Sequence, residues 1–146
     1  MTDADRPVRQ ILAAYQAAVL AKDVDAFVAL FADDVHVFDI WGPWSQQGIA
    51  GWREMATGWF GSLGDERVVV EADDVRTRVA GDIATLTAFL TFRAVDAQGH
   101  ALRSLDNRLS WVLRRQAGCW KVAQEHTSIP IDSATGKGRF KRPETP

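Results

Sequence analysis

The sequence predicts an α+β domain in which helices pack against one face of an antiparallel sheet. Apolar residues recur at helical spacing near the N-terminus, and long strand-like segments fill the second half of the chain. Short glycine-bearing breaks separate those segments, which favours antiparallel hairpins. A run of helices followed by a run of strands is typical of an α+β domain.

Length and composition exclude several classes of protein. A chain of 146 residues with 47% hydrophobic and 25% charged residues fits one soluble globular domain. The net charge of −2 leaves no basic patch for nucleic acid or an anionic membrane, so we expect neither as a partner. Cys119 is the single cysteine, and no basic-then-apolar leader follows Met1; we therefore expect a cytoplasmic protein.

The elements follow in order along the chain. Helices are expected at Val8–Leu20, at Val24–Phe31 with Asp23 as its N-cap, and at Ile49–Leu63. Strands are expected at Val35–Ile40, Arg67–Arg78, Ile83–Val95, Ala101–Arg115 and Cys119–Ile129. The final segment, 133–146, holds two glycines, two prolines and four basic residues and predicts a flexible tail after a domain spanning 1–132.

Asp39 and Tyr15 are the first candidates for chemistry. Alternation places Asp39 on the strand face of Val35 and Val37, where burial would raise the pKa of the carboxyl and suit it to general acid–base work. The alternative is a solvated residue at the strand end. Tyr15 shares the buried face of the first helix, where its hydroxyl either donates to a ligand carbonyl or bonds the backbone of the core.

Two further polar residues and a group of aromatic residues are candidates for a ligand pocket that would also hold Asp39 and Tyr15. Arg108 either lines the pocket or is solvated, because the opposite face of its strand is the more apolar one. His126 is either a pocket acid–base group or a histidine of the core or of an interface. The aromatic candidates are Trp41 and Trp44, expected at the pocket entrance, and Trp52, Trp59 and Phe60, whose helical spacing also suits a core.

Two stretches carry a family resemblance. Residues 22–35, KDVDAFVALFADDV, and residues 120–128, WKVAQEHTS, resemble the second-helix and closing-strand signatures of the nuclear transport factor 2-like superfamily, in its SnoaL-like and ketosteroid isomerase-like branch. The resemblance covers residues 8–132. It implies a cystatin-like cone, with three N-terminal helices packed in a curved antiparallel sheet around a central pocket.

The resemblance also suggests roles. Tyr15 and Asp39 match the oxyanion-donating tyrosine and the proton-shuttling aspartate of ketosteroid isomerases, whose second, protonated aspartate falls on or near Ser110 here. A serine is the weaker donor, so steroid isomerisation itself is not expected. Arg108 matches a pocket-lining arginine of kinase-association domains.

Two functions are therefore expected. One is a cofactor-independent and metal-free enzyme that moves a proton next to a carbonyl of an apolar cyclic or polyketide-like molecule, with Asp39 as base, Tyr15 as donor and His126 and Arg108 assisting. The other is a ligand-binding or association module in which Arg108 holds an acidic ligand. The resemblance implies a homodimer in either case.

Overall fold

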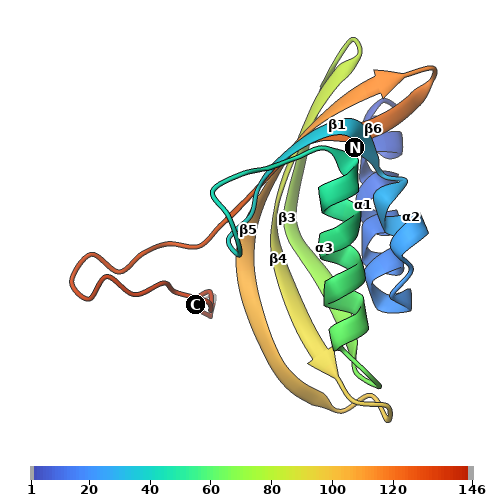
Figure 1. Cartoon of the computed structure of the whole chain (residues 1–146). Coiled ribbons are helices and arrows are strands. Elements are labelled where there is room, and N and C mark those ends of the chain that lie inside the picture. The colour runs from blue at the N-terminus through green and yellow to red at the C-terminus, as the bar shows by residue number, and fades with distance from the viewer. Residues whose placement is uncertain (1, 145–146) are drawn as a thin grey trace.

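Three helices lie along one face of a six-stranded, strongly curved sheet, which confirms the predicted fold class (Figure 1). The structure is a computed structural model and describes residues 2–144. The helices are α1 (Asp5–Ala21), α2 (Val24–Val28) and α3 (Ile49–Ser62). The strands are β1 (Phe31–Phe38), β2 (Gln46–Gln47), β3 (Arg67–Ala80), β4 (Ile83–Val95), β5 (Ala101–Gln116) and β6 (Cys119–Ser128).

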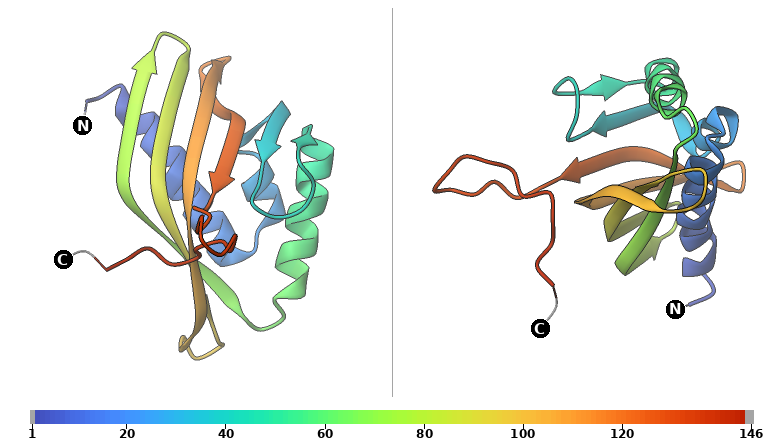
Figure 2. Two further views of the ribbon diagram at one scale, coloured as in Figure 1. Left: turned by 90° about the vertical axis from the view of Figure 1, so that its left-hand side faces the viewer. Right: turned by 90° about the horizontal axis from the view of Figure 1, so that it is seen from below.

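The order of the sheet is β2-β1-β6-β5-β4-β3, and β3 to β6 form the expected antiparallel meander. The strand β1 lies parallel to β6, and the short β2 pairs antiparallel with β1. Figure 2 shows the sheet in front of α1, with the outer face of the strands toward the viewer in its left-hand view. Because Phe38 pairs with His126, the chain that follows β1 begins beside the end of β6.

The boundary between α2 and β1 differs from the prediction. Asp23 caps α2 as expected, its Oδ1 accepting a hydrogen bond from the amide of Ala26 at 3.0 Å. The helix ends at Val28, however, because the carbonyl of Leu30 accepts from the amide of Val122 in β6 at 2.9 Å and the chain joins the sheet there. Phe31, expected in the helix, is therefore the first residue of β1.

An aromatic cluster fills the space between the helices and the sheet. Phe27 is fully buried, and its ring lies 5.4 Å from that of Tyr15, 5.1 Å from Phe31 and 6.1 Å from Trp52, measured between centroids. Buried aromatic pairs at these separations stabilise a core beyond the area that they bury. The cluster holds α1, α2 and α3 together at the closed end of the cone.

The strand β6 contains a β-bulge that decides which of its side chains face the helices. Val122 pairs with Leu113, whereas Gln124 pairs with the preceding residue Val112, so Ala123 is one residue in excess. An extra residue reverses the alternation of a strand beyond it. Val122 is buried before the bulge, and Glu125 is buried after it.

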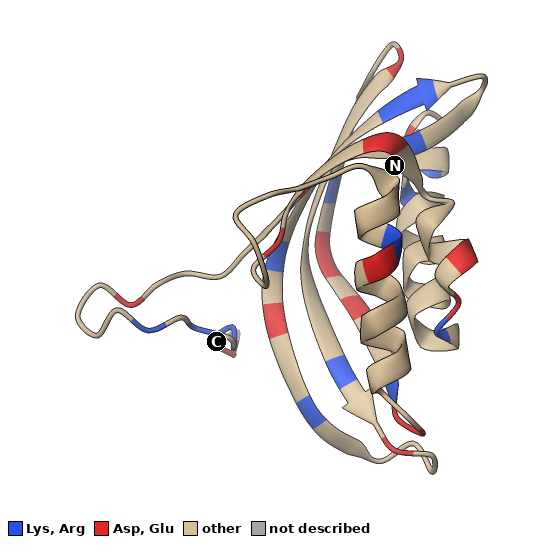
Figure 3. Ribbon diagram, viewed as in Figure 1, with Lys and Arg blue, Asp and Glu red and all other residues tan. Residues whose placement is uncertain are grey.

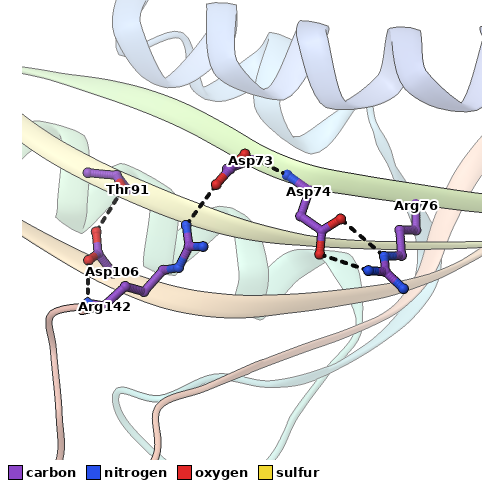
Figure 4. A network of polar contacts seen from close by, with 6 residues as sticks. All are labelled: Asp73, Asp74, Arg76, Thr91, Asp106 and Arg142. Atoms are coloured by element: carbon purple, nitrogen blue, oxygen red, sulfur yellow. Dashed lines mark hydrogen bonds and ion pairs between the residues drawn. The ribbon is translucent and has the colours of Figure 1, made fainter. Parts of the chain in front are cut away.

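The segment after β6, expected to be flexible, follows a defined course as far as residue 144. It leaves the sheet, turns back at a bridge between Ile131 and Gly138, and returns to the face opposite the helices, which we call the outer face (Figure 1). There the amide of Arg142 donates to Asp106 Oδ2 at 2.7 Å and its guanidinium to Asp73 Oδ2 at 3.0 Å (Figure 4). Arg142 also lies over the ring of Phe89.

Within residues 2–144 we find no helix whose length and apolar character would let it span a lipid bilayer.

Candidate functional site

A cavity of about 780 Å³ lies between α3, the inner face of the sheet and the loop that follows β1. This volume is within the range of small-molecule binding sites. Its apolar wall includes Trp52, Met55, Trp59 and Leu63 from the α3 side and Phe92 and Leu105 from the sheet. Four side chains that can lose a proton, Tyr15, Asp39, Glu54 and Glu125, also line it, and of these only Glu54 is exposed.

Asp39 follows β1 directly, and the structure places it on the cavity wall, on the strand face of the buried Val35 and Val37. Its Oδ1 accepts a hydrogen bond from the hydroxyl of Thr127 in β6 at 2.7 Å. Burial raises the pKa of this carboxyl, and the hydrogen bonds from Thr127 and from the backbone of Ile40 and Trp41 offset part of the rise. A carboxylate in this setting is a stronger base than one in water.

Tyr15 comes from the middle of α1, whose buried face is set by the helical spacing of its apolar residues. Its ring lies 5.4 Å from that of Phe27 and 5.7 Å from that of Trp111. Burial, followed by the charges of Glu125 and Asp39, raises the pKa of the hydroxyl well above its usual 10. Tyr15 therefore keeps its proton and is available as a hydrogen-bond donor.

Glu125 is a buried acidic residue of the cavity that the sequence pattern did not predict. Its side chain is 3% exposed, and its Oε1 accepts a hydrogen bond from Trp111 Nε1 at 2.8 Å. Burial, together with the charge of Asp39, raises the pKa of Glu125 from 4.5 to about 7, although the bond from Trp111 works against the rise. Glu125 is thus a carboxylic acid that holds its proton close to neutral pH.

His126 does not line this cavity, and the expectation that placed it there was wrong. Simple alternation from Trp120 and Val122 puts His126 on the inner face, but the bulge at Ala123 turns it outward and turns Glu125 inward. His126 is exposed and instead lines a second cleft, which we call the outer cleft and whose lining also includes Asp39 and Thr127.

Arg108 and Ser110 also lie on the outer face, so their predicted position in the cavity is likewise corrected. Both side chains are exposed, and Arg108 Nε donates to Ser128 Oγ at 2.9 Å. The physical reason is the alternation of β5, whose apolar set, including Leu109 and Trp111, faces the helices. Ser110 pairs across the strands with His126.

The aromatic candidates divide into two groups. Trp41, Trp52 and Trp59 line the cavity, and Trp41 at its mouth stacks on Phe140 of the C-terminal segment at 5.5 Å. The other two do not line it. Trp44 is 99% exposed and borders the outer cleft, and Phe60 is buried in the core against Phe27.

The charged side chains in the buried part of the cavity wall, Asp39 and Glu125, are both acidic. Arg103 lines the rim, where its guanidinium donates to Glu66 at 2.7 Å. Elsewhere acidic and basic side chains are interspersed along the strands and helices (Figure 3). In the described part of the chain, no three histidine, cysteine, aspartate or glutamate side chains gather as a metal site. The buried wall of the cavity offers proton donors and acceptors in Tyr15, Asp39 and Glu125.

Comparison with known proteins places this geometry in a family. A model of the SnoaL-like domain matches residues 8–132. The chain belongs to the SnoaL-like family. No protein with a curated description matches it.

Several solved structures share the fold of this SnoaL-like domain. An NTF2-like protein of unknown function from Pseudomonas putida KT2440 is 26% identical, with a TM-score of 0.85 and 98% of each chain covered. An NTF2-like protein with a cystatin-like fold from Novosphingobium aromaticivorans is 20% identical, with a TM-score of 0.75 and coverage of 91% of this chain and 86% of that one. Aln2 from a Streptomyces species is 16% identical, with a TM-score of 0.77 and coverage of 88% and 91%. The last two likenesses concern the fold alone.

One feature of the sequence could have pointed to Glu125 as a candidate site residue. Trp120-Lys121-Val122-Ala123-Gln124-Glu125 contains a single carboxylate, in a strand that otherwise packs on the core. A bulge in that strand reverses the faces, and nothing in the residue pattern marks its position. The carboxylate was therefore visible in the sequence, but the direction of its side chain was not.

Proposed function

We propose that this protein is a cofactor-independent enzyme that moves a proton next to a carbonyl group of a neutral, apolar cyclic molecule of polyketide-like character. The observation that carries the proposal is the presence of three acids with raised pKa values, Asp39, Tyr15 and Glu125, on the wall of one cavity. Perturbed acids gathered in a pocket are a recurrent property of catalytic sites.

Each residue has a defined role in the proposed reaction. The carboxylate of Asp39 takes a proton from the carbon next to the carbonyl, and the electron pair of the broken C–H bond forms the enolate. The hydroxyl of Tyr15 and the neutral carboxyl of Glu125 donate hydrogen bonds to the enolate oxygen. Where a β,γ double bond of the substrate extends the enolate into a dienolate, the protonated Asp39 returns the proton to the γ carbon, so that the double bond moves into conjugation and the enzyme is unchanged.

In the proposed reaction, Glu125 acts as the second oxyanion donor, for which the sequence pattern had offered only a serine. The second oxyanion donor was expected on or near Ser110 of β5, which faces outward. Glu125 lies on β6, and its partner across the strands is Trp111, the inward neighbour of Ser110 along β5. The acid is thus supplied by the adjacent strand, and the objection raised by the serine no longer applies.

The charge of the cavity favours a neutral ligand. An acidic ligand would meet two carboxyls at depth, and the cation at the rim, Arg103, is paired with Glu66. Arg108, which the binding-module hypothesis needs as the partner of an acidic ligand, faces away from the cavity. A module that binds a neutral ligand without turnover is the alternative that an experiment must separate.

Exchange of carbon-bound hydrogen tests the proposal directly. In D₂O, the wild-type protein should speed deuterium incorporation next to the carbonyl of 2-tetralone, an enolisable two-ring ketone, as followed by NMR. Asp39→Asn should lower the rate of exchange by about 10²- to 10⁴-fold while binding of the ketone persists, because the amide cannot accept the proton.

The matched control is Asp33→Asn. Asp33 is an exposed aspartate of β1, the strand that Asp39 follows, so its replacement should leave exchange unchanged. Exchange that is equally fast with the Asp39→Asn variant, or no faster with the wild-type protein than in buffer, would contradict the proposal and favour the binding module.

A further inference from the structure

Asn107 is a buried amide of β5 that lines the cavity and has no hydrogen-bond partner for its Oδ1 within residues 2–144. Its side chain is 6% exposed. Buried polar atoms without a partner are rare in folded proteins, because each costs the free energy of its lost hydration. An unpartnered amide on a cavity wall is therefore a candidate for contact with a ligand.

The register of the sheet places Asn107 relative to the acids. Glu125 pairs with Trp111, and Thr127, which holds Asp39, pairs with Leu109. Asn107 is the next inward residue of β5 after Leu109. Two residues of a strand span about 7 Å, so Asn107 lies about 7 Å along β5 from the row that contains Thr127.

The surroundings of Asn107 on the cavity wall are apolar. Its inward neighbours on β5 are Leu105 and Leu109, and its cross-strand partner is Leu90, which is fully buried. A single amide in such a wall can discriminate strongly, because a ligand that lacks the matching group leaves the amide unpaired. Trp52 Nε1, from α3, is a second buried polar atom of the cavity lining without a partner in the described chain.

We propose that Asn107 is a specificity-determining residue whose side-chain amide hydrogen-bonds a hydroxyl group on the substrate, carried by a ring other than the one that bears the reacting carbonyl. The inference rests on the proposed function, since it takes the Asp39 end of the cavity as the place of the carbonyl. It narrows the substrate class to neutral fused-ring ketones with a distal hydroxyl group.

The test compares two ligands and two forms of the protein. Isothermal titration calorimetry should show that the wild-type protein binds 6-hydroxy-2-tetralone about three- to tenfold more tightly than 2-tetralone, which lacks the hydroxyl on the far ring. Asn107→Leu, a change of similar size, should bind the two ketones equally. The preference should persist with Asp39→Asn, so loss of turnover and loss of this recognition are separate results.

Thermal unfolding gives a second readout that a structural role would not produce. Asn107→Leu should keep or raise the midpoint of unfolding, because it removes a buried amide oxygen that has no partner. Gln98→Leu is the control, since Gln98 is an exposed amide of the loop between β4 and β5, outside the cavity lining, and should leave the ligand preference unchanged.

Three results would overturn the proposal. They are a midpoint lowered by several degrees in Asn107→Leu, an equal affinity of the wild-type protein for the two ketones, and the absence of binding of either ketone.

Discussion

Glu125 is the residue whose protonation links the chemistry of the site to pH. Its pKa of about 7 means that it is close to half protonated at neutral pH, whereas Tyr15 keeps its proton throughout the physiological range. Asp39, whose pKa burial raises and whose charge raises the pKa of Glu125, is the group that must lose its proton to act as a base. The three roles require Asp39 ionised and Glu125 neutral at the same time.

The rate of proton exchange should therefore follow a bell-shaped curve. It should rise with pH as Asp39 ionises, and fall above about pH 7 as Glu125 loses its proton. Glu125→Gln should abolish the fall, because the amide remains a donor at every pH. The check is the rate of deuterium incorporation into 2-tetralone on either side of neutral pH, and a fall that persists in Glu125→Gln would assign it to another group.

Individual residues show where sequence reasoning reached the site and where it did not. Alternation from Val35 onward in β1 and helical periodicity along α1 placed Asp39 and Tyr15 on the cavity wall, because both patterns run without interruption to those residues. The same alternation failed for His126 and Glu125, since the bulge lies between them and the buried Val122. Asn107 stood among leucines on the inner face of β5, where apolarity alone gave no reason to single it out.

At the scale of elements, hairpins were predictable and parallel pairing was not. Gly81 and Gly118 marked the turns of the β3–β4 and β5–β6 hairpins because positive φ angles favour glycine. The parallel pairing of β1 with β6 joins residues far apart in the chain, and no local pattern records it. That pairing brings Thr127 to Asp39, so it is the element-scale contact on which the site depends.

The β5–β6 hairpin offers a stabilising substitution. Ala117, with φ of 49°, adopts the left-handed conformation beside Gly118, whose φ is 80°. Two central residues with positive φ favour Asn-Gly, and a left-handed alanine is strained by about 1 kcal/mol. Ala117→Asn should therefore raise the free energy of unfolding by several tenths of a kcal/mol to about 1 kcal/mol in urea titrations.

A matched control for that change is Ala101→Asn. Ala101 is exposed at the start of β5 and does not have a positive φ, so asparagine relieves no left-handed strain there. If Ala117→Asn and Ala101→Asn have the same effect, relief of backbone strain is not the cause.

Across the whole molecule, Glu125 makes stability depend on pH. Its pKa is about 7 in the folded protein against 4.5 in an exposed glutamate, so between these values the folded chain holds a proton that the unfolded chain releases. The contribution of Glu125 to the free energy of unfolding is fully present below pH 4.5. It decreases as the pH rises and is lost above about pH 7. The difference is about 3 kcal/mol.

Urea unfolding of the wild-type protein and Glu125→Gln, at about pH 5 and about pH 8, measures this contribution. The wild-type protein should lose more stability than the variant between the two conditions, since glutamine does not ionise. Exposed carboxyls such as Asp34 and Asp73 have lowered pKa values, so they are ionised at both pH values and cancel in the comparison. Parallel losses in the two proteins would show that Glu125 is not the cause.

Assembly is a further prediction at this scale. The family resemblance predicts a homodimer formed through the sheet, and the outer face exposes part of Phe38 beside His126, with ring centroids 5.5 Å apart. We propose that this face contacts a second copy. Light scattering coupled to gel filtration should give a mass twice that of the chain, and Phe38→Asp should shift it toward the monomer; a monomeric wild-type protein would contradict this.

The β-bulge at Ala123 also bears on how the side chains that line this cavity could change during evolution. The last strand carries two alternative sets of side chains, Glu125 and Thr127 toward the cavity and Gln124 and His126 toward the outside. If the same residues ran straight past Ala123, Gln124 would lie opposite Trp111, and an imidazole would reach the substrate in place of the hydroxyl of Thr127. Within this architecture, a change of reaction chemistry is therefore accessible through the gain or loss of one backbone irregularity, without any new side chain having to arise.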